Sequence, residues 1–166
     1  MENKIIAVLG ATGAQGGSLI RAMLNDSEKE FVPRALTRNP SSDKAKELAE
    51  LGVEVVSADV DDEESLRNAF KGAYGAFCVT FFWEHFSPEK EAGQVASFAK
   101  IAKENNLKHV IWSTLEDTRN WIPLSDDRMP TLMEKYKVPH FDAKGESDKY
   151  FKEAGVPTTY LLTSFY

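Results

Sequence analysis

Short apolar runs alternate along the chain with segments that carry apolar residues on one side. The first run, Lys4 to Leu9, is rich in β-branched residues and ends at Gly10, the pattern of a strand buried on both faces. Five further strands are expected at residues 31–36, 53–58, 74–80, 107–113 and 157–164. Helices are expected between them at residues 18–25, 43–51, 63–70, 88–106 and 142–154.

This alternation of strand and helix predicts an α/β fold. Strands joined through helices lie parallel and are connected by right-handed crossovers, which gives a doubly wound sheet. Residues 114–138 break the pattern with several prolines and are expected to be irregular. The last expected strand reaches the end of the sequence with no helix after it, so we expect a truncated chain or a short isoform.

A glycine-rich turn after the first strand carries the clearest functional signal. Gly10, Gly13 and Gly16 are spaced as G-x-x-G-x-x-G. We expect Gly10 to allow the tight turn, Gly13 to let the backbone approach phosphates, and Gly16 to let helix and strand pack closely. Backbone N–H groups at the positive end of the helix would then face a pyrophosphate. Because the turn joins the first strand to a helix, it favours a Rossmann-type dinucleotide site over a plain turn.

The end of the second strand indicates which dinucleotide is bound. NAD sites place a carboxylate there for the ribose 2′-hydroxyl, whereas this chain has Thr37, Arg38 and Asn39. A guanidinium can bind a 2′-phosphate through two hydrogen bonds, although elsewhere on a chain an arginine is by default a solvated surface residue. We therefore expect NADP(H), with Arg38 at the 2′-phosphate and Thr37 and Asn39 as further hydrogen-bond partners.

Two later strand ends are candidate contacts for the rest of the cofactor. Asp59 and Val60 follow the third strand, where such folds bind the adenine, but Asp59 could equally cap the next helix. Thr80, Phe81 and Phe82 end the fourth strand beside the expected cofactor path. The two aromatic residues could instead cover the edge of the sheet.

Composition and charge narrow the classes of partner. The 166 residues are 42% hydrophobic and 28% charged, which is ordinary for a globular domain. A net charge of -6 argues against direct nucleic-acid binding, and no apolar run is long enough to cross a membrane. The single cysteine, Cys78, lies in an apolar run and is expected to be a buried hydrophobe in a reducing compartment. We expect a cytoplasmic protein, with nuclear entry left open, and no metal, since no ligand cluster has metal spacing.

Three segments together resemble the NmrA-like family of atypical short-chain dehydrogenases. They are the glycine turn at 10–17, Thr-Arg-Asn-Pro at 37–40 and His-Phe-Asp-Ala-Lys-Gly-Glu at 140–146, and the similarity runs from about Lys4 to Tyr166. The chain is most similar to the NADP(H)-sensing, HSCARG-type members. The resemblance implies that residues 1–166 form an NAD(P)-binding Rossmann domain without the small C-terminal domain of the family.

The resemblance also implies regulation through protein contacts rather than turnover, and it assigns cofactor roles to individual residues. By that resemblance the phosphates are bound by Gly10, Ala11, Thr12, Gly13, Ala14 and Gln15. The 2′-phosphate is bound by Arg38, the adenine by Asp59 and Val60, the ribose side by Thr80 to Phe82, and the nicotinamide ribose by Lys144, while Tyr166 begins a loop over the nicotinamide.

Short-chain dehydrogenases pair a tyrosine acid with a lysine four residues later, whose charge lowers the tyrosine pKa. Four residues before Lys144 this chain has His140. We expect Lys144 to hold ribose beside a non-catalytic His140; a proton-donating His140 and a packed loop histidine are the alternatives. Ser113 occupies the place of the usual catalytic serine, and with Thr114 it is expected to make strand-end hydrogen bonds.

Three functions follow from these residues. The first is a redox-sensing regulator whose NADP(H)-dependent state is read by a protein partner. The presence of a cofactor site without the tyrosine acid supports this function. A homodimer is also compatible with it. The second is an NADPH-dependent reductase of a quinone, carbonyl or phenylpropanoid-like substrate, in which Lys144 supplies a proton or positive charge and residues 114–138 form a lid. The third is an interaction module that binds nucleotide poorly.

Overall fold

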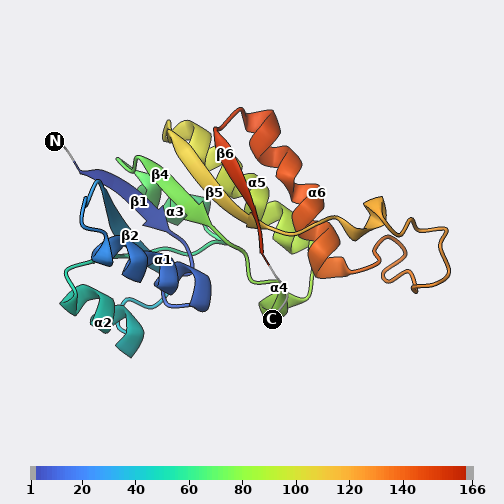
Figure 1. Ribbon diagram of the computed structural model, residues 1–166, viewed down its shortest axis with the longest axis horizontal. Helices are drawn as coiled ribbons and strands as arrows, with labels where there is room; N and C mark the ends of the chain where they lie inside the picture. Colours follow the sequence, from blue (N-terminus) through green and yellow to red (C-terminus); the bar gives the residue numbers. More distant parts are fainter. Residues whose placement is uncertain (1–2, 164–166) are drawn as a thin grey trace.

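Six parallel strands form one sheet in the computed structural model, which describes residues 3–163 (Figure 1). The strands are β1 (Lys4–Val8), β2 (Phe31–Thr37), β3 (Glu54–Ser57), β4 (Gly75–Cys78), β5 (His109–Thr114) and β6 (Thr158–Leu162). The helices are α1 (Ala14–Asn25), α2 (Asp43–Glu50), α3 (Glu63–Phe70), α4 (Phe82–His85), α5 (Pro88–Glu104) and α6 (Pro139–Ala154), with a short 3-10 helix η1 (Thr118–Asn120). The expectation of a doubly wound, Rossmann-type α/β sheet is confirmed.

The order of the strands creates a crevice at one edge of the sheet. The strand order is β3-β2-β1-β4-β5-β6. Strands β2 and β3 lie on one side of β1, and β4, β5 and β6 lie on its other side. Helices α1 and α2 cover one face, and α3, α5 and α6 cover the other (Figure 1). The connections that leave the carboxyl ends of β1 and β4 therefore diverge, and open α/β sheets bind ligands at such a point.

The core lies between the sheet and its two helical layers. All four residues of β4 are buried, and Trp112 on β5 packs against Phe151 of α6 with ring centroids 6.0 Å apart. Cys78 is fully buried, and burial raises the pKa of its thiol well above its ordinary value. None of the helices within residues 3–163 is long and apolar enough to cross a membrane.

Several element boundaries differ from those expected from the sequence. Helix α1 begins at Ala14 rather than residue 18, because the glycines of its first turns are needed for packing and override their low helix propensity. Helix α6 begins at Pro139 rather than residue 142, since proline is well suited to a first helical turn. Helix α4 was not expected at all, and it follows β4, which ends at Cys78 instead of residue 80.

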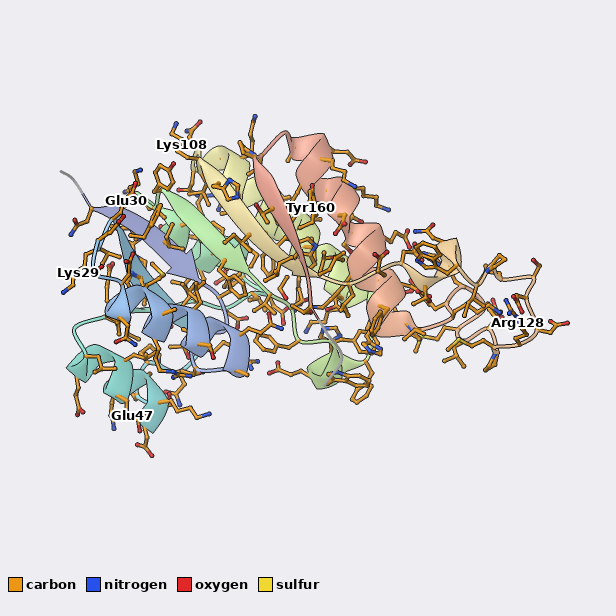
Figure 2. All side chains as sticks on the ribbon, viewed as in Figure 1. Lys29, Glu30, Glu47, Lys108, Arg128 and Tyr160 are labelled. Carbon is orange, nitrogen blue, oxygen red and sulfur yellow. The ribbon has the colours of Figure 1, made fainter. Side chains whose placement is uncertain are left out.

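The segment between β5 and α6 projects from one end of the molecule, with Arg128 near its outer end (Figure 2). Its base is tied to α6 by the buried carboxylate of Asp142. One oxygen of Asp142 accepts from the backbone N–H of Thr118 at 2.9 Å, and the other accepts from those of Lys137 at 2.7 Å and Val138 at 3.1 Å. The segment is irregular, as expected, but its ends are fixed by buried hydrogen bonds.

Candidate functional site

A pocket of about 480 Å³ opens at the carboxyl ends of β1 and β4, where the strand order reverses. Small-molecule and cofactor sites commonly have volumes of roughly 300–1,000 Å³. One wall is the glycine turn with the start of α1, a second is the connection from β4 through α4, and a third is the start of α6. The predicted site residues that line it are Gly10, Gly13, Ala14, Gln15, Gly16, Thr80, Phe81, Phe82, His140 and Lys144.

The glycine turn is built by contacts that leave no room for a side chain. Gly10 has a φ of +65°, and a Cβ there would lie 2.8 Å from the Phe81 ring. A Cβ on Gly16 would lie 2.5 Å from the carbonyl oxygen of Gly10. The N–H of Gly13 donates to that same oxygen at 2.9 Å, which closes the turn. The packing of the turn against the Phe81 ring and against itself therefore requires glycine at positions 10 and 16.

The N-terminus of α1 is open to an anion. Gly13 caps the helix and contributes no side-chain hydrogen bond, and the first turn contains no acidic residue. The N–H groups of a first helical turn lack partners within the helix and lie at its positive end. Because this end of α1 lines the pocket, the residues present fit the pyrophosphate of a dinucleotide.

Lys144 enters the pocket from α6 and is almost completely buried. Its Nζ donates to the backbone oxygen of Ser113 at 3.1 Å and lies 5.2 Å from the centroid of the Trp112 ring. Burial lowers the pKa of Lys144, and the carboxylate of Glu91 opposes that shift. The side chain can thus present a cation to a ligand, and its charge is sensitive to its surroundings.

Glu91 of α5 does not line the pocket, but it is joined to the pocket wall through Thr80, and nothing in the sequence predicted this contact. It is fully buried and accepts a hydrogen bond from the hydroxyl of Thr80, while its Oε2 has no hydrogen-bond partner among residues 3–163. Burial raises the pKa of Glu91. Nothing in the sequence signals this role, because a glutamate in a first helical turn is ordinarily a solvated residue at the positive helix end.

His140 lies among aromatic rings at the pocket. Its ring centroid is 4.7 Å from that of Trp83 and 4.9 Å from that of Phe141. Burial and then the nearby charge of Lys144 lower the pKa of His140, which favours the neutral ring at neutral pH. Trp83 and Phe141, which also line the pocket, were missed by the sequence analysis.

Arg38 stands outside the pocket lining but is connected to it. Its Nη2 pairs with Oε1 of Glu84 at 2.8 Å, and Glu84 lines the pocket. This exposed ion pair joins the end of β2 to α4. Asn39, next along the chain, instead accepts a hydrogen bond from the N–H of Ser41 at 3.0 Å.

The remaining predicted residues lie away from the pocket lining. Asp59 accepts from the N–H of Asp61 at 3.0 Å, and α3 is capped by Asp62, so the alternative role of Asp59 as the helix cap is wrong. Val60 is half-buried against the core. The others are Ala11, which is buried, Thr12, whose carbonyl accepts from Lys44 at 3.4 Å, and Tyr166, which is outside the described residues.

The hydroxyls at the end of β5 are used within the protein. Ser113 is fully buried and donates to Oε1 of Gln15 at 2.6 Å, and Thr114 donates to Oδ1 of Asp148 at 2.8 Å. Within the part of the chain that the structure describes, no group of three or more histidine, cysteine or acidic residues is placed to hold a metal ion.

Comparison with protein families gives a match over nearly the whole sequence. The NmrA-like family model matches residues 2–166. An NmrA-like family domain-containing oxidoreductase, FrzB of Cladobotryum sp., is 48% identical over 148 residues, covering 84% of this chain and 42% of that protein. An NmrA-like family domain-containing protein of Dictyostelium discoideum is 30% identical, covering 98% of this chain and 50% of its own.

Solved structures share the fold. NmrA, a negative transcriptional regulator, aligns with a TM-score of 0.80 at 24% identity, over 99% of this chain and 47% of NmrA. Triphenylmethane reductase of Citrobacter sp. aligns with a TM-score of 0.75 at 24% identity, over 98% of this chain and 50% of the reductase. The chain spans about half the length of the proteins that it matches.

Proposed function

The chain belongs to the NmrA-like family, and from this premise we propose that it binds NADP(H) in the pocket at the carboxyl ends of β1 and β4. The observation that carries the proposal is the glycine turn together with the N-terminus of α1, whose N-cap residue Gly13 makes no side-chain hydrogen bond. NmrA has been crystallised in complex with NAD and with NADP, and triphenylmethane reductase with NADP(H). These neighbours support a dinucleotide as the ligand of the same fold.

In the proposed complex, the pyrophosphate lies against the backbone of the glycine turn, and Lys144 donates to the ribose next to the nicotinamide. Arg38 binds the 2′-phosphate. Since Arg38 now pairs with Glu84, the phosphate replaces a carboxylate partner, and the charge on the guanidinium stays neutralised. This exchange explains how an exposed arginine outside the pocket lining takes part in recognition.

We further propose that nucleotide binding is read by a protein partner, as in a redox sensor. The support is the missing tyrosine acid, because the residue four positions before Lys144 is His140, whose depressed pKa favours a neutral ring. For such a sensor to switch, its two states must differ in affinity for the nucleotide.

A reductase is the second candidate function, and two observations favour it. Lys144 lines the pocket with a lowered pKa, which makes it a better proton donor than an exposed lysine. Relatives are named oxidoreductases, and the structural neighbours include an NADPH-dependent quinone oxidoreductase. When bound, NADPH supplies hydride; Lys144 would supply the proton or a positive charge to the reduced oxygen or carbon.

The proposed NADP(H) site is tested by titrating NADPH and NADH into the 166-residue chain and into Arg38→Ala. We expect NADPH to bind more tightly than NADH. Loss of the charge-assisted contacts of Arg38 should weaken NADPH binding by about ten- to a hundredfold, with little effect on NADH. Arg128→Ala removes an equally charged, exposed side chain far along the projecting segment and should change neither. Equal affinities of the parent chain for the two nucleotides would refute the role of Arg38.

The sensor and the reductase are separated by measuring NADPH oxidation at saturating nucleotide with quinones and carbonyl compounds. Turnover that is lost in Lys144→Ala but kept in His140→Ala would support the reductase and contradict a pure sensor. Tight NADPH binding with no oxidation of the nucleotide by these substrates would support the sensor.

A further inference from the structure

His85, the last residue of α4, makes a hydrogen bond that joins α4 to α5. Its Nδ1 accepts from the backbone N–H of Ser87 at 3.1 Å, and Ser87 is the N-cap of α5. A side chain that accepts from the backbone two residues later has the arrangement of an Asx turn, and here the acceptor is an imidazole nitrogen. An unprotonated Nδ1 is therefore part of the turn between the two helices.

The ring of His85 has no place for a second proton in this turn. Since Nδ1 accepts, the proton of the neutral ring lies on Nε2, which is buried and has no hydrogen-bond partner among residues 3–163. Protonation of Nδ1 would turn it into a donor that faces the N–H of Ser87. The observed turn therefore accommodates only the neutral form of His85.

The charged groups around His85 come from three parts of the chain. They are Glu84 on α4, Lys90 in the first turn of α5 and Asp61 before α3. Burial and then Lys90 lower the pKa of His85, and they prevail over the two carboxylates, which raise it. Both carboxylates already have cationic partners: Asp61 pairs with Lys90 at 2.7 Å, and Glu84 pairs with Arg38 at 2.8 Å. The surroundings thus oppose the cation that the turn also excludes.

Helix α4 is short, and its position depends on such contacts. It contains four residues, and the chain leaves it through Phe86 at a φ of +54°, a left-handed conformation that is unfavourable for a residue with a Cβ. Strained backbone of this kind persists only where the surrounding structure fixes it. Trp83 and Glu84 of α4 line the pocket, so a change at the end of α4 reaches the pocket wall.

We propose that His85 is a pH-sensitive switch in the wall of the pocket: its neutral ring keeps α4 joined to α5, with Trp83 and Glu84 at the pocket, and proton uptake by His85 releases this wall. The effect on nucleotide binding rests on the proposed NADP(H) site, whereas the switch itself does not. Because the joined form accepts only the neutral ring, it is favoured above the ordinary histidine pKa of about 6.5 and loses that advantage as the pH falls below it.

Amide hydrogen exchange at Phe86, Ser87 and Lys90 tests the switch without nucleotide, each rate being divided by the intrinsic rate of that amide at the same pH. These N–H groups form the hydrogen bonds at the junction of α4 and α5. With an ordinary histidine pKa in the released form, the ratio of released to joined molecules rises about tenfold between pH 7.5 and pH 5.5. We expect protection to fall by that factor in the parent chain. Equal protection at both pH values would overturn the proposal.

Variants assign the acid response to one histidine. His85→Asn retains an acceptor for the N–H of Ser87 without a group that titrates in this range, so protection should stay high at both pH values. His85→Ala should lose protection at both. His140→Asn removes the histidine that reaches the ring of Phe82 from α6, and His109→Asn removes an exposed one at the start of β5. Both should retain the acid response of the parent. An acid response that survives in either His85 variant, or that disappears in His140→Asn, would overturn the proposal.

NADPH binding at the same two pH values relates the switch to the proposed site. The dissociation constant of the parent chain should rise by up to about tenfold at pH 5.5, and that of His85→Asn should rise less, while titration of the nucleotide itself affects both proteins alike. By reciprocity, bound NADPH should lower the pKa of His85 further, which NMR of the ring protons measures. If no form binds NADPH, the proposed NADP(H) site fails and hydrogen exchange still decides the switch. If the parent and His85→Asn bind NADPH with the same pH dependence, the effect on the nucleotide is refuted.

Discussion

At the scale of single residues, the glycine turn is the part of the site that local sequence specifies most completely. Gly10 takes a left-handed conformation, and Gly16 lies against the backbone of Gly10. Both requirements act over a few residues, so the spacing of the glycines was enough to predict the turn. The burial of Glu91 depends on how α5 packs against the sheet, and for that reason no pattern in the sequence could reveal it.

The Arg38–Glu84 pair is a residue-scale contact with a measurable effect on nucleotide preference. In the NADP(H) complex that we propose, Glu84 competes with the 2′-phosphate for Arg38. Exposed ion pairs are worth about 0.2–1 kcal/mol, so Glu84→Gln should strengthen NADPH binding by up to about fivefold. The effect on NADH should be smaller, because NADH has no 2′-phosphate and leaves the pair intact.

Two further proteins make this measurement specific. The gain should vanish when Glu84→Gln is combined with Arg38→Ala. Glu30→Gln removes a carboxylate from an exposed ion pair with Lys4, at the far end of the strands, and should leave the ratio of NADPH to NADH affinity unchanged. A weaker NADPH affinity in Glu84→Gln would show that the carboxylate helps to bind the nucleotide rather than competing with it.

At the scale of elements, the expected helices and strands exist, and the differences are concentrated around the site. The start of α1 was placed too late because three glycines near it argue against a helix when only propensity is considered. Helix α4 contains four residues, too few for a periodic pattern to appear in the sequence. Both elements line the pocket, so local signals were weakest where packing and function determine the backbone.

The buried carboxylate of Asp142 makes backbone hydrogen bonds that connect the projecting segment to α6. Asp142→Ala would leave the N–H groups of Thr118, Lys137 and Val138 without their acceptor. Each donor left unsatisfied costs about 1–3 kcal/mol. We therefore expect a loss of several kcal/mol in unfolding free energy, or a local opening of residues 115–138 that limited proteolysis detects.

Asp127→Ala is the matched control, since Asp127 is exposed on the same segment. It should leave both the stability and the rate of cleavage close to those of the parent chain. If Asp142→Ala were as stable and as resistant to proteases as Asp127→Ala, the segment would be held by other contacts.

At the scale of the whole molecule, the alternation of strands and helices predicted the sheet, and the strand order places the site. The glycine turn and the β4 end were expected near each other because both belong to the carboxyl edge of the sheet. The arrival of His140 and Lys144 at the same pocket could not be derived from periodicity, since an irregular segment separates α6 from β5. It was implied by the resemblance to a family.

The dependence of stability on acid pH is a property of the whole molecule, because carboxylates in several parts of the chain contribute to it. Arg119 pairs with Asp117 at 2.8 Å and Glu146 at 2.9 Å. Burial of each carboxyl group opposes its ionisation, but the hydrogen bonds and charge of Arg119 prevail and lower both pKa values. The pKa of Asp61 is lowered by Gln94 and Lys90. A carboxyl group whose pKa is lowered in the fold binds protons more readily in the unfolded chain. These groups therefore stabilise the fold above about pH 4, and they lose that effect as the pH falls through their folded pKa values.

We therefore expect the unfolding free energy to decline as the pH is lowered from about 6 to about 3. Arg119→Gln should be less stable than the parent chain at about pH 6, and its stability should fall less between these pH values, because Asp117 and Glu146 lose the guanidinium that helps to lower their pKa values. Arg128→Gln, which loses an exposed pair with Asp126, should keep most of the parent's acid response. If the unfolding free energies of the parent and of Arg119→Gln changed in parallel with pH, the cluster around Arg119 would contribute nothing to the acid response. In that case the acid response would have to come from the carboxylates on other elements, of which Asp61 and Glu63 have lowered pKa values.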